Sequence, residues 1–510
     1  MRNLFPTFGI RSRGWWIDAA IVLLALALRA AWIEIKPPHF DEGVNGWFVD
    51  QMTRTGYYHY DPGNFHGPLH FYTIFVSLTL FGREVWALRL PVVIVSTLCV
   101  AVVLAFRRYL PERACRLAAL AMAVSPGCVF YGRYSIHESW LLLFLLVSVW
   151  GLAGLWRDGR RDQLWAAALG LTGMVLTKET YALHGVALLL AVPVLLVFEL
   201  LSPSAPFASG GRRWTMHDLD RALVVSVALI FFFYTGGLLD WSSLQGIVLT
   251  FAKWMHTGTG GESGHEKNWP YFIELIARCE WPALLGLGAT CGLAIKGASR
   301  FTRYLAIYGC GALAAYSLIS YKTPWCVIVL VWPFYFVFGL AAHRLLDWLD
   351  RWTVGALTAL VLAFSLGQSR ALNFRNFTDE DEPYVYVQTL PDIRKLLDPL
   401  RALTARDPLN HSIAGQVMTV DHHPLVWLLG AFPNVRMLSP DDDPAEGDAA
   451  FLLVDESVAE RTESGLTQSY FKETFRLRGN ANESEMLYLN AAQFAFYFPG
   501  REPEFVPSLR

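Results

Sequence analysis

Charged residues are scarce in this chain. Lysine, arginine, aspartate and glutamate make up only 17% of its 510 residues, whereas 54% are hydrophobic. A composition this apolar excludes an ordinary soluble multidomain protein. The formal net charge of −2 shows no basic excess, so we expect no nucleic-acid partner.

Cysteine is also sparse and follows no pattern. None of the seven cysteines forms a CxxC or another metal-type spacing, and all precede residue 330. Most lie in apolar runs, where a thiol behaves as a small buried hydrophobic group. We find no internal repeat at a solenoid period and no Walker spacing that would predict a nucleotide-binding loop.

Apolar segments long enough to cross about 30 Å of hydrocarbon, in contrast, recur down to about residue 370. Arginine and lysine gather at every second gap between them, and the positive-inside rule assigns those gaps to the cytoplasm. The clusters are Arg11/Arg13, Arg107/Arg108/Arg113/Arg116, Arg157/Arg160/Arg161, Arg212/Arg213/Arg221, Lys296/Arg300/Arg303 and Arg344/Arg351. The sequence therefore predicts an α-helical, multi-pass protein of the cytoplasmic membrane with about eleven transmembrane helices, the N-terminus inside and the C-terminus outside.

Residues 69–82 are apolar but short for a crossing. Counting them as a span would move Arg107 and Arg108 to the outer side, so we predict a helix that lies in the outer interface. The first apolar run has no small-residue cleavage site, which favours an uncleaved anchor helix over a signal peptide.

The region after residue 370 has a different composition. It carries acidic runs, contains no segment long enough to span a membrane, and has no cysteine that could form a disulfide. Strand-like runs at 385–387 and 451–454 alternate with a helical stretch near 391–406. We predict two domains, a transmembrane domain over residues 1–370 and a soluble extracytoplasmic α/β domain over residues 371–510.

Unusual polar residues collect in the loops assigned to the outer side. Each set lies at the mouth of an apolar segment, whereas the cytoplasmic loops hold mostly arginines that follow the topology. The outer sets are Asp41 and Glu42; Arg133, His137 and Glu138; Lys178 and Glu179; His256, Glu262, His265 and Lys267; and Tyr321 and Lys322. This asymmetry predicts a functional site at the outer face.

Asp41 and Glu42 are the predicted catalytic residues. A general base is an ionised carboxylate set against a nucleophile, and apolar surroundings left by the first helix raise its basicity. The alternative is that the acids merely end a helix at the interface. Arg29, deep in the first helix, either pairs with them or extends to the interface.

The next two outer sets allow more than one interpretation each. His137 and Glu138 either contact substrate hydroxyls or bind a divalent ion with Asp41, or else Glu138 simply caps the helix that it begins. Lys178 and Glu179 form a self-satisfied pair, or Lys178 binds a phosphate. No spacing demands a metal, so a divalent cation is only a possible cofactor.

The glycine-rich loop 257–267 is either a mobile lid that delivers His265 or Lys267 to a site, or a plain connector. Lys322 lies just before an apolar span, where it is suited to bind phosphate or lipid headgroups.

These motifs resemble the GT-C superfamily of membrane glycosyltransferases, in particular its protein O-mannosyltransferase and aminoarabinose-transferase-like branch. The resemblance rests on Asp41-Glu42 in the first outer loop and on Gly67-Pro68-Leu69-His70, Ala87–Pro91 and Leu176-Thr177-Lys178-Glu179. A narrower similarity is to prokaryotic flippase-activity-associated proteins, through His265–Trp269, Tyr321–Trp325 and Pro383–Gln388.

The resemblance implies an inverting glycosyltransferase that uses a polyprenyl-phosphate-linked sugar. Asp41 would deprotonate an acceptor hydroxyl of a glycan, lipid or protein, and Arg133, Lys178 and Lys322 would hold the donor phosphate. Two alternatives remain: a non-catalytic accessory protein for flipping or export of lipid-linked sugars, and a binding or sensor protein. A transporter would be expected to show an internal repeat with charges near mid-membrane, whereas here the charges lie at one face.

Overall fold

The computed structural model describes residues 14–204, 207, 210–258, 264–295, 299–442, 448–479 and 484–507. Contacts divide the chain into two compact units. The first, here the helical unit, contains Met1–Ile33 and Gln51–Asn376, and the second, here the mixed-sheet unit, contains Glu34–Asp50 and Phe377–Arg510. Residues 34–50, expected to be part of the membrane domain, therefore fold with the C-terminal region. The helix α2 (Phe40–Thr55) begins in the mixed-sheet unit and ends in the helical unit.

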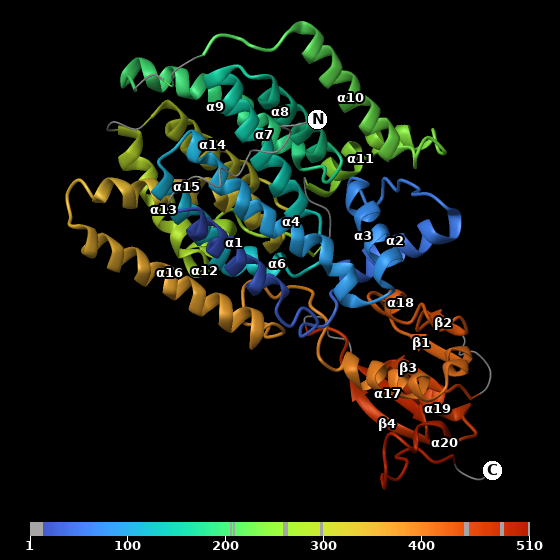
Figure 1. Ribbon diagram of the computed structural model, residues 1–510. Helices are drawn as coiled ribbons and strands as arrows, with labels where there is room; N and C mark the ends of the chain where they lie inside the picture. The colour runs from blue at the N-terminus through green and yellow to red at the C-terminus, as the bar shows by residue number, and fades with distance from the viewer. Residues whose placement is uncertain are drawn as a thin grey trace. The chain divides into compact units, whose positions relative to one another are not determined.

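The helical unit consists of helices of different lengths that are joined by turns and longer loops (Figure 1). Its helices are α1 (Trp15–Ala30), α3 (Leu69–Phe81), α4 (Val85–Ala105), η1 (Phe106–Arg108), α5 (Glu112–Val124), α6 (Pro126–Tyr131), α7 (Glu138–Asp158), α8 (Arg161–Val175), α9 (Tyr181–Leu201), α10 (Met216–Tyr234), α11 (Ser243–Gly258), α12 (Tyr271–Cys279), α13 (Trp281–Ile295), α14 (Arg300–Leu318), η2 (Pro324–Cys326), α15 (Val327–Leu345) and α16 (Arg351–Phe374).

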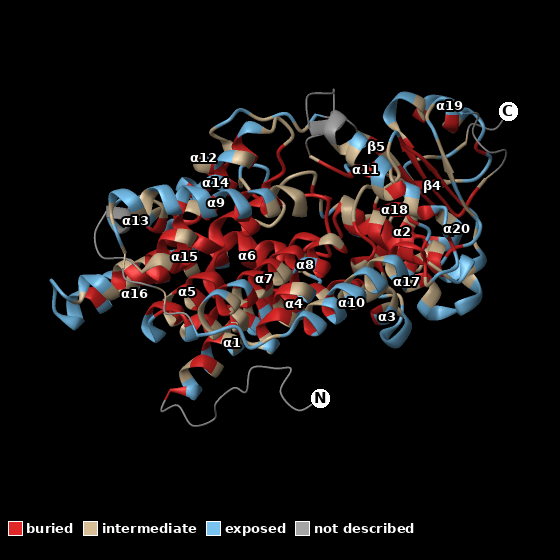
Figure 2. Cartoon of the chain, turned by 90° about the horizontal axis from the view of Figure 1, so that it is seen from above, coloured by how far each residue is buried: buried red, intermediate tan, exposed pale blue. Residues whose placement is uncertain are grey.

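Helix α15 forms the centre of this unit. It packs against α5, α13 and α14. In its most apolar stretch 94% of the residues are buried, whereas the corresponding share for α16 is 22%. Figure 2 shows the same contrast in colour between α15 and the outer helices. Large apolar side chains are exposed along α9, α10 and α16, among them Leu189, Leu200, Val224 and Leu360. Apolar surface of this extent suits contact with lipid rather than water.

Five helices in the described part of the chain are long and apolar enough to cross a membrane: Val85–Arg108, Glu138–Asp158, Tyr181–Leu201, Pro324–Leu345 and Arg351–Phe374. The helix predicted over 69–82 is present as α3. Its 13 residues rise about 20 Å, which is short of the hydrocarbon thickness. Six further helices of the unit, α1, α5, α8, α10, α13 and α14, would complete the eleven spans, and that number stays a prediction.

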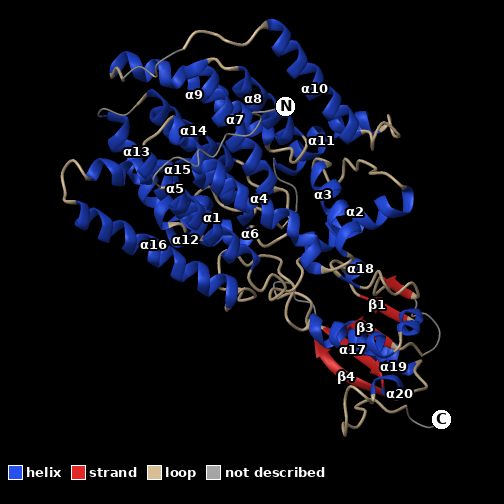
Figure 3. Ribbon diagram, in the orientation of Figure 1, coloured by secondary structure: helices blue, strands red, loops and turns tan. Residues whose placement is uncertain are grey.

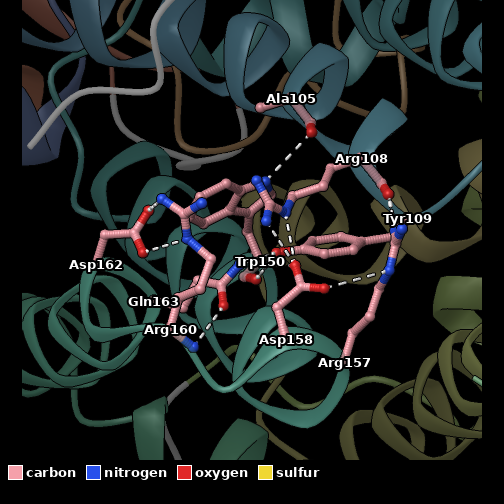
Figure 4. Close-up of polar contacts among 9 residues, drawn as sticks. All are labelled: Ala105, Arg108, Tyr109, Trp150, Arg157, Asp158, Arg160, Asp162 and Gln163. Carbon is pink, nitrogen blue, oxygen red and sulfur yellow. Dashed lines mark hydrogen bonds and ion pairs between the residues drawn. The ribbon is translucent and has the colours of Figure 1, made fainter. Parts of the chain in front are cut away.

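Arginines tie together the turn that joins α7 to α8 (Figure 4). The guanidinium of Arg108 donates to Asp158 over 2.6 and 2.9 Å, and Arg160 donates to Asp162 over 2.8 and 3.0 Å. Gln163 also donates to Asp158, at 3.4 Å. These arginines belong to the clusters that the sequence predicts to face the cytoplasm, and the ion pairs show how their charge is balanced.

The mixed-sheet unit holds all five named strands (Figure 3). Its elements, besides the start of α2, are α17 (Ile393–Arg406), η3 (Pro408–Ser412), β1 (Gly415–Met418), α18 (Leu425–Leu428), β2 (Val435–Leu438), β3 (Phe451–Asp455), η4 (Glu456–Val458), α19 (Ala459–Ser464), β4 (Tyr470–Phe475), β5 (Glu485–Asn490) and α20 (Ala491–Phe494). The strand order is β2-β1-β3-β5-β4. The β2-β1 and β1-β3 pairs are parallel, and the β3-β5 and β5-β4 pairs are antiparallel.

Alternating side chains of β3 supply two cores, one on each face of the sheet. Phe451 and Leu453 pack with α17 through Leu396 and Leu400. Leu452 and Val454 pack on the other face in a cluster with Tyr470 and Tyr488, among others. A strand with both faces buried has a continuous apolar sequence, which explains the apolar run at 451–454.

The expected α/β fold of the C-terminal region is therefore confirmed, with α17 and β3 where the sequence predicted a helix and a strand. The strand predicted at 385–387 is wrong. Val385 donates to the carbonyl of Glu382 in a turn, and Val387 has a positive φ of 50°, which no strand residue adopts.

Close helix packing in the helical unit generates a stability prediction. A Cβ on Gly286 of α13 would overlap the carbonyl oxygen of Phe334 in α15, whereas Gly288 in the same helix has open space around it. We expect Gly286→Ala to destabilise the fold by about 1–3 kcal/mol because α13 and α15 must separate. Gly288→Ala is the matched control and should leave the melting temperature in detergent unchanged. Equal melting temperatures for the two variants would contradict the close α13-α15 contact.

Candidate functional site

Two loops of the helical unit run side by side where α3, α7 and α9 begin. The amide of Gly67 donates to the carbonyl of Thr177 at 3.1 Å, and the amide of Leu69 donates to that of Leu176 at 3.0 Å. A Cβ on Gly67 would overlap the backbone of Leu176. Glycine is thus required for the two backbones to approach, and this approach brings the predicted motifs at 67–70 and 176–179 together.

The first result of this approach is a contact between His66 and Glu179. Nδ1 of His66 lies 2.9 Å from Oε2 of Glu179, and the Glu179 side chain is almost fully buried. Burial alone would raise the pKa of Glu179, but the charges of His66 and Lys178 outweigh it and hold the pKa below its usual value. Glu179 is therefore a buried carboxylate that stays ionised.

The approach of the two loops is accompanied by an ion pair between Lys178 and Glu138, the first residue of α7. Both are buried, with exposed fractions of 6% and 2%. Burial lowers the pKa of Lys178, yet the negative charges of Glu138 and Glu179 dominate and raise it well above its usual value. Lys178 is thus a cation at every physiological pH, and its partner is Glu138 rather than the neighbouring Glu179.

His137 lies beside these pairs, immediately before α7. Its ring centroid is 4.5 Å from those of His66 and His70. Burial, followed by the positive potential of these rings and Lys178, lowers the pKa of His137 well below its usual value. The ring is therefore neutral. Its buried Nε2 has no hydrogen-bond partner among the described residues, which is the state expected of a nitrogen that meets a ligand.

Arg133 and Arg29 instead hold helix ends. The guanidinium of Arg133 donates to the carbonyls of Leu28, Ala31 and Trp32 at 2.6–2.9 Å, where α1 ends. Arg29 is fully buried and donates to the carbonyls of Ala25, Met122 and Ala123 at 3.1–3.2 Å. Arg29 is thus buried inside the unit and does not extend to the interface. The contacts of Arg133 with the end of α1 already account for its buried position without a bound phosphate.

The loop motifs at 265–269 and 321–325 also meet. Glu266 and Tyr321 form an antiparallel bridge, and the amide of Lys322 donates to the carbonyl of His265 at 3.0 Å. The buried ammonium of Lys322 donates to the carbonyls of Lys267, at 2.9 Å, and Ile319. Residues 259–263, with Glu262, lie outside the described residues, as does the side chain of His256, so the predicted lid stays a prediction.

Asp41 and Glu42 lie in the first turn of α2, in the mixed-sheet unit, and they differ in how far their side chains are exposed. Glu42 is fully buried, and its Oε2 accepts the backbone amide of His39 at 3.0 Å, which caps its own helix. The Asp41 side chain is 35% exposed. Of the two predicted catalytic acids, Asp41 is therefore the one that solvent or a substrate reaches.

Sequence reasoning gave no role to three histidines of these clusters, namely His39, His66 and His70. His66 and His70 stand four residues apart on either side of Gly67-Pro68, a spacing that places both near one helix start and was a usable signal. Within the described part of the chain, no group of three or more His, Cys, Asp or Glu side chains is arranged to hold a metal ion.

Comparison with known proteins identifies relatives by sequence and by fold. Residues 65–211 match the family described as dolichyl-phosphate-mannose-protein mannosyltransferase. No curated protein matches the chain by sequence. The chain is similar to the structure of ArnT from Cupriavidus metallidurans bound to undecaprenyl phosphate, with a TM-score of 0.64 and 15% identity over 94% of this chain and 99% of that one. The apo form of that protein gives a TM-score of 0.62 and 13% identity over 94% and 98%. At this level of identity the likeness is one of fold.

The Lys178-Glu138 ion pair generates a prediction about stability. Glu138→Gln would leave the Lys178 ammonium buried without its partner, so we expect a loss of about 3–5 kcal/mol of unfolding free energy. Asp162→Asn is the matched control, because the Arg160-Asp162 pair is partly exposed and should contribute about 0–1 kcal/mol.

The measurement is unfolding of the purified variants in detergent. The double variant Glu138→Gln/Lys178→Met removes both charges and should recover part of the loss. A Glu138→Gln variant as stable as Asp162→Asn would contradict the buried ion pair.

Proposed function

We propose that this chain, which has the GT-C fold, is an inverting glycosyltransferase that moves a sugar from a polyprenyl-phosphate donor to an acceptor at the outer face of the cytoplasmic membrane. The resemblance to the GT-C superfamily, predicted from the motifs, is confirmed at the level of the fold. The match of residues 65–211 to the mannosyltransferase family supports a membrane glycosyltransferase. The ArnT structure contains undecaprenyl phosphate, and this supports a donor of the polyprenyl-phosphate class.

The observation that carries the proposal is the buried polar cluster at the start of α7 and α9. An ion pair, a second ionised carboxylate and a neutral histidine with an unpartnered nitrogen are buried together beside apolar helices. Such groups are costly in that setting unless they serve a polar ligand. A sugar phosphate has the matching chemistry, with anionic oxygens for Lys178 and hydroxyls for Glu138, Glu179 and His137.

An ammonium carries three N–H donors, and Glu138 accepts one of them. Lys178 can therefore keep its ion pair and still donate to a phosphate oxygen. We assign Arg133, His265, Lys267 and Lys322 to the same ligand as supporting groups. Arg133 and Lys322 would do so while holding the backbone carbonyls that they contact.

Asp41 acts as the base in this proposal. It accepts the proton of an acceptor hydroxyl while the oxygen attacks the anomeric carbon of the sugar, and the bond from that carbon to the phosphate oxygen breaks. The electron pair leaves with the polyprenyl phosphate, whose negative charge the cationic side chains stabilise. Attack opposite the leaving group inverts the anomeric centre. Glu42 supports Asp41 by capping the helix that both begin.

The finer assignments are proposals of the same kind. We place the N-terminus in the cytoplasm and the C-terminal region outside, with a glycan, lipid or protein as the acceptor and membrane lipids around the helices. We also propose residues 1–370 as the transferase domain and 371–510 as the outer domain, although residues 34–50, which carry Asp41, belong to the compact mixed-sheet unit.

Asp41→Asn tests the base directly. The amide has the same shape but cannot accept the proton, so we expect kcat to fall by about a hundred- to ten-thousandfold with donor binding retained. The measurement is transfer of radiolabel from polyprenyl-phosphate hexoses, in liposomes, to acceptors in a membrane extract of the host, with and without EDTA.

Asp50→Asn is the matched control, because it makes the same change later in α2 and should transfer normally. Full activity of Asp41→Asn would remove Asp41 as the base. If the unaltered protein transfers no label but speeds movement of the lipid across the bilayer, the accessory flipping role replaces the transferase.

Lys178→Ala tests the phosphate contact. Loss of a charge-assisted hydrogen bond should weaken donor binding by about ten- to a hundredfold. Glu138→Gln breaks the same ion pair but keeps the ammonium, so it should retain more donor affinity than Lys178→Ala. Lys253→Ala removes an exposed lysine of α11 and is the control for charge alone. An unchanged affinity for the lipid donor in Lys178→Ala would exclude Lys178 from the phosphate site.

A further inference from the structure

The helix that carries Asp41 begins against residues from the C-terminal part of the chain, within the mixed-sheet unit. The amide of Gln388 donates to the carbonyl of Pro37 at 3.0 Å, and the guanidinium carbon of Arg478 lies 5.4 Å from the centre of the Phe40 ring. A Cβ on Gly43 would overlap Pro424. The first turn of α2 is therefore fixed by residues more than 300 positions away in the sequence.

His39, the residue before α2, also contacts this C-terminal part of the chain. It is 2% exposed, and its Nε2 lies 2.7 Å from the carbonyl oxygen of Tyr386. A carbonyl only accepts, so Nε2 carries the hydrogen. The other nitrogen, Nδ1, lies 3.1 Å from the backbone amide of Asp41 and accepts its hydrogen. The two bonds select a single neutral tautomer and use both nitrogens of the ring.

We propose that His39 is a positioning residue that links the carbonyl of Tyr386 to the backbone amide of Asp41, and so sets the direction of the proposed base. This inference rests on the proposed function, because it concerns the orientation of Asp41. It gives the backbone carbonyl of Tyr386 a part in orienting Asp41.

The surrounding geometry supports such a link. The amide of His39 donates to Glu42 at 3.0 Å, so its backbone and its ring are both held. Val387, the residue after Tyr386, has a φ of 50°, which is strained for a β-branched side chain. Strained backbone persists where the surrounding contacts determine it and clusters at functional sites. Burial also lowers the pKa of His39 to about 3, so the ring keeps the same donor and acceptor at working pH.

Two substitutions separate the two bonds of the ring. In His39→Asn the side-chain oxygen takes the place of Nδ1 and can still accept from the amide two residues on, but the Tyr386 contact is lost. In His39→Gln the side-chain NH₂ takes the place of Nε2 and can still reach Tyr386, but the bond to Asp41 is lost. A purely local role at the helix start would be preserved in His39→Asn.

We expect both variants to lower kcat by about a hundredfold, the effect of a misplacement near 1 Å, with the KM for the lipid donor unchanged. Hydrogen exchange should be faster near Tyr386 in His39→Asn and faster at the Asp41 amide in His39→Gln. His411→Asn is the matched control. His411 also pairs Nδ1 with a carbonyl, that of Pro408 at 2.9 Å, and its loss should change neither kcat nor exchange near Asp41.

Normal kcat in His39→Asn would overturn the link and leave only a local turn. A rise in donor KM together with a lower melting temperature would mean general disruption and would also overturn it. If the unaltered protein shows no transfer, the proposed function fails, and hydrogen exchange decides the link alone. Unchanged exchange near Tyr386 in His39→Asn would then reject it.

Discussion

A charge buried at the end of apolar helices has to be paired, and the helical unit is organised around this requirement. The ammonium of Lys178 is paired with Glu138, which itself stands at the positive N-terminus of α7. To form this pair, the turn before α9 must lie against the start of α7, and Gly67 allows a third chain segment to approach the same turn. The ion pair thus holds the starts of α7 and α9 together, and the backbone hydrogen bonds at Gly67 and Leu69 add the start of α3 with its two histidines, His66 and His70.

The buried arginines meet a related constraint from the backbone. A helix ends with carbonyls that have no partner in the helix, and lipid offers none. Arg133 satisfies carbonyls where α1 ends, and Arg29 does the same where α5 ends. These side chains therefore owe their burial to helix ends, and an unusual arginine in an apolar segment is not by itself a sign of ligand binding.

The sequence was most informative about which segments matter. The pattern of basic gaps and apolar runs predicted the helical unit, and the motifs at 67–70 and 176–179, and at 265–269 and 321–325, do lie side by side. The sequence could not predict which side chains pair with one another. Lys178 could pair with either of two glutamates, and only the approach of α7 decides between them. The run at 385–387 looked like a strand because its composition is β-branched, yet the carbonyl of Tyr386 is bonded to a side chain 347 residues earlier.

Because His39 is neutral, it can orient Asp41 without lowering the basicity of the Asp41 carboxylate. Its Nδ1 lies 3.9 Å from the carboxylate of Asp41. A protonated imidazole at that distance would favour the ionised acid and make it a poorer proton acceptor. Because burial keeps the ring neutral, the contact with Asp41 runs through the backbone amide and adds no positive charge beside the carboxylate. A lysine or arginine in this place could orient the loop equally well, but it would lower the basicity on which the proposed transfer depends.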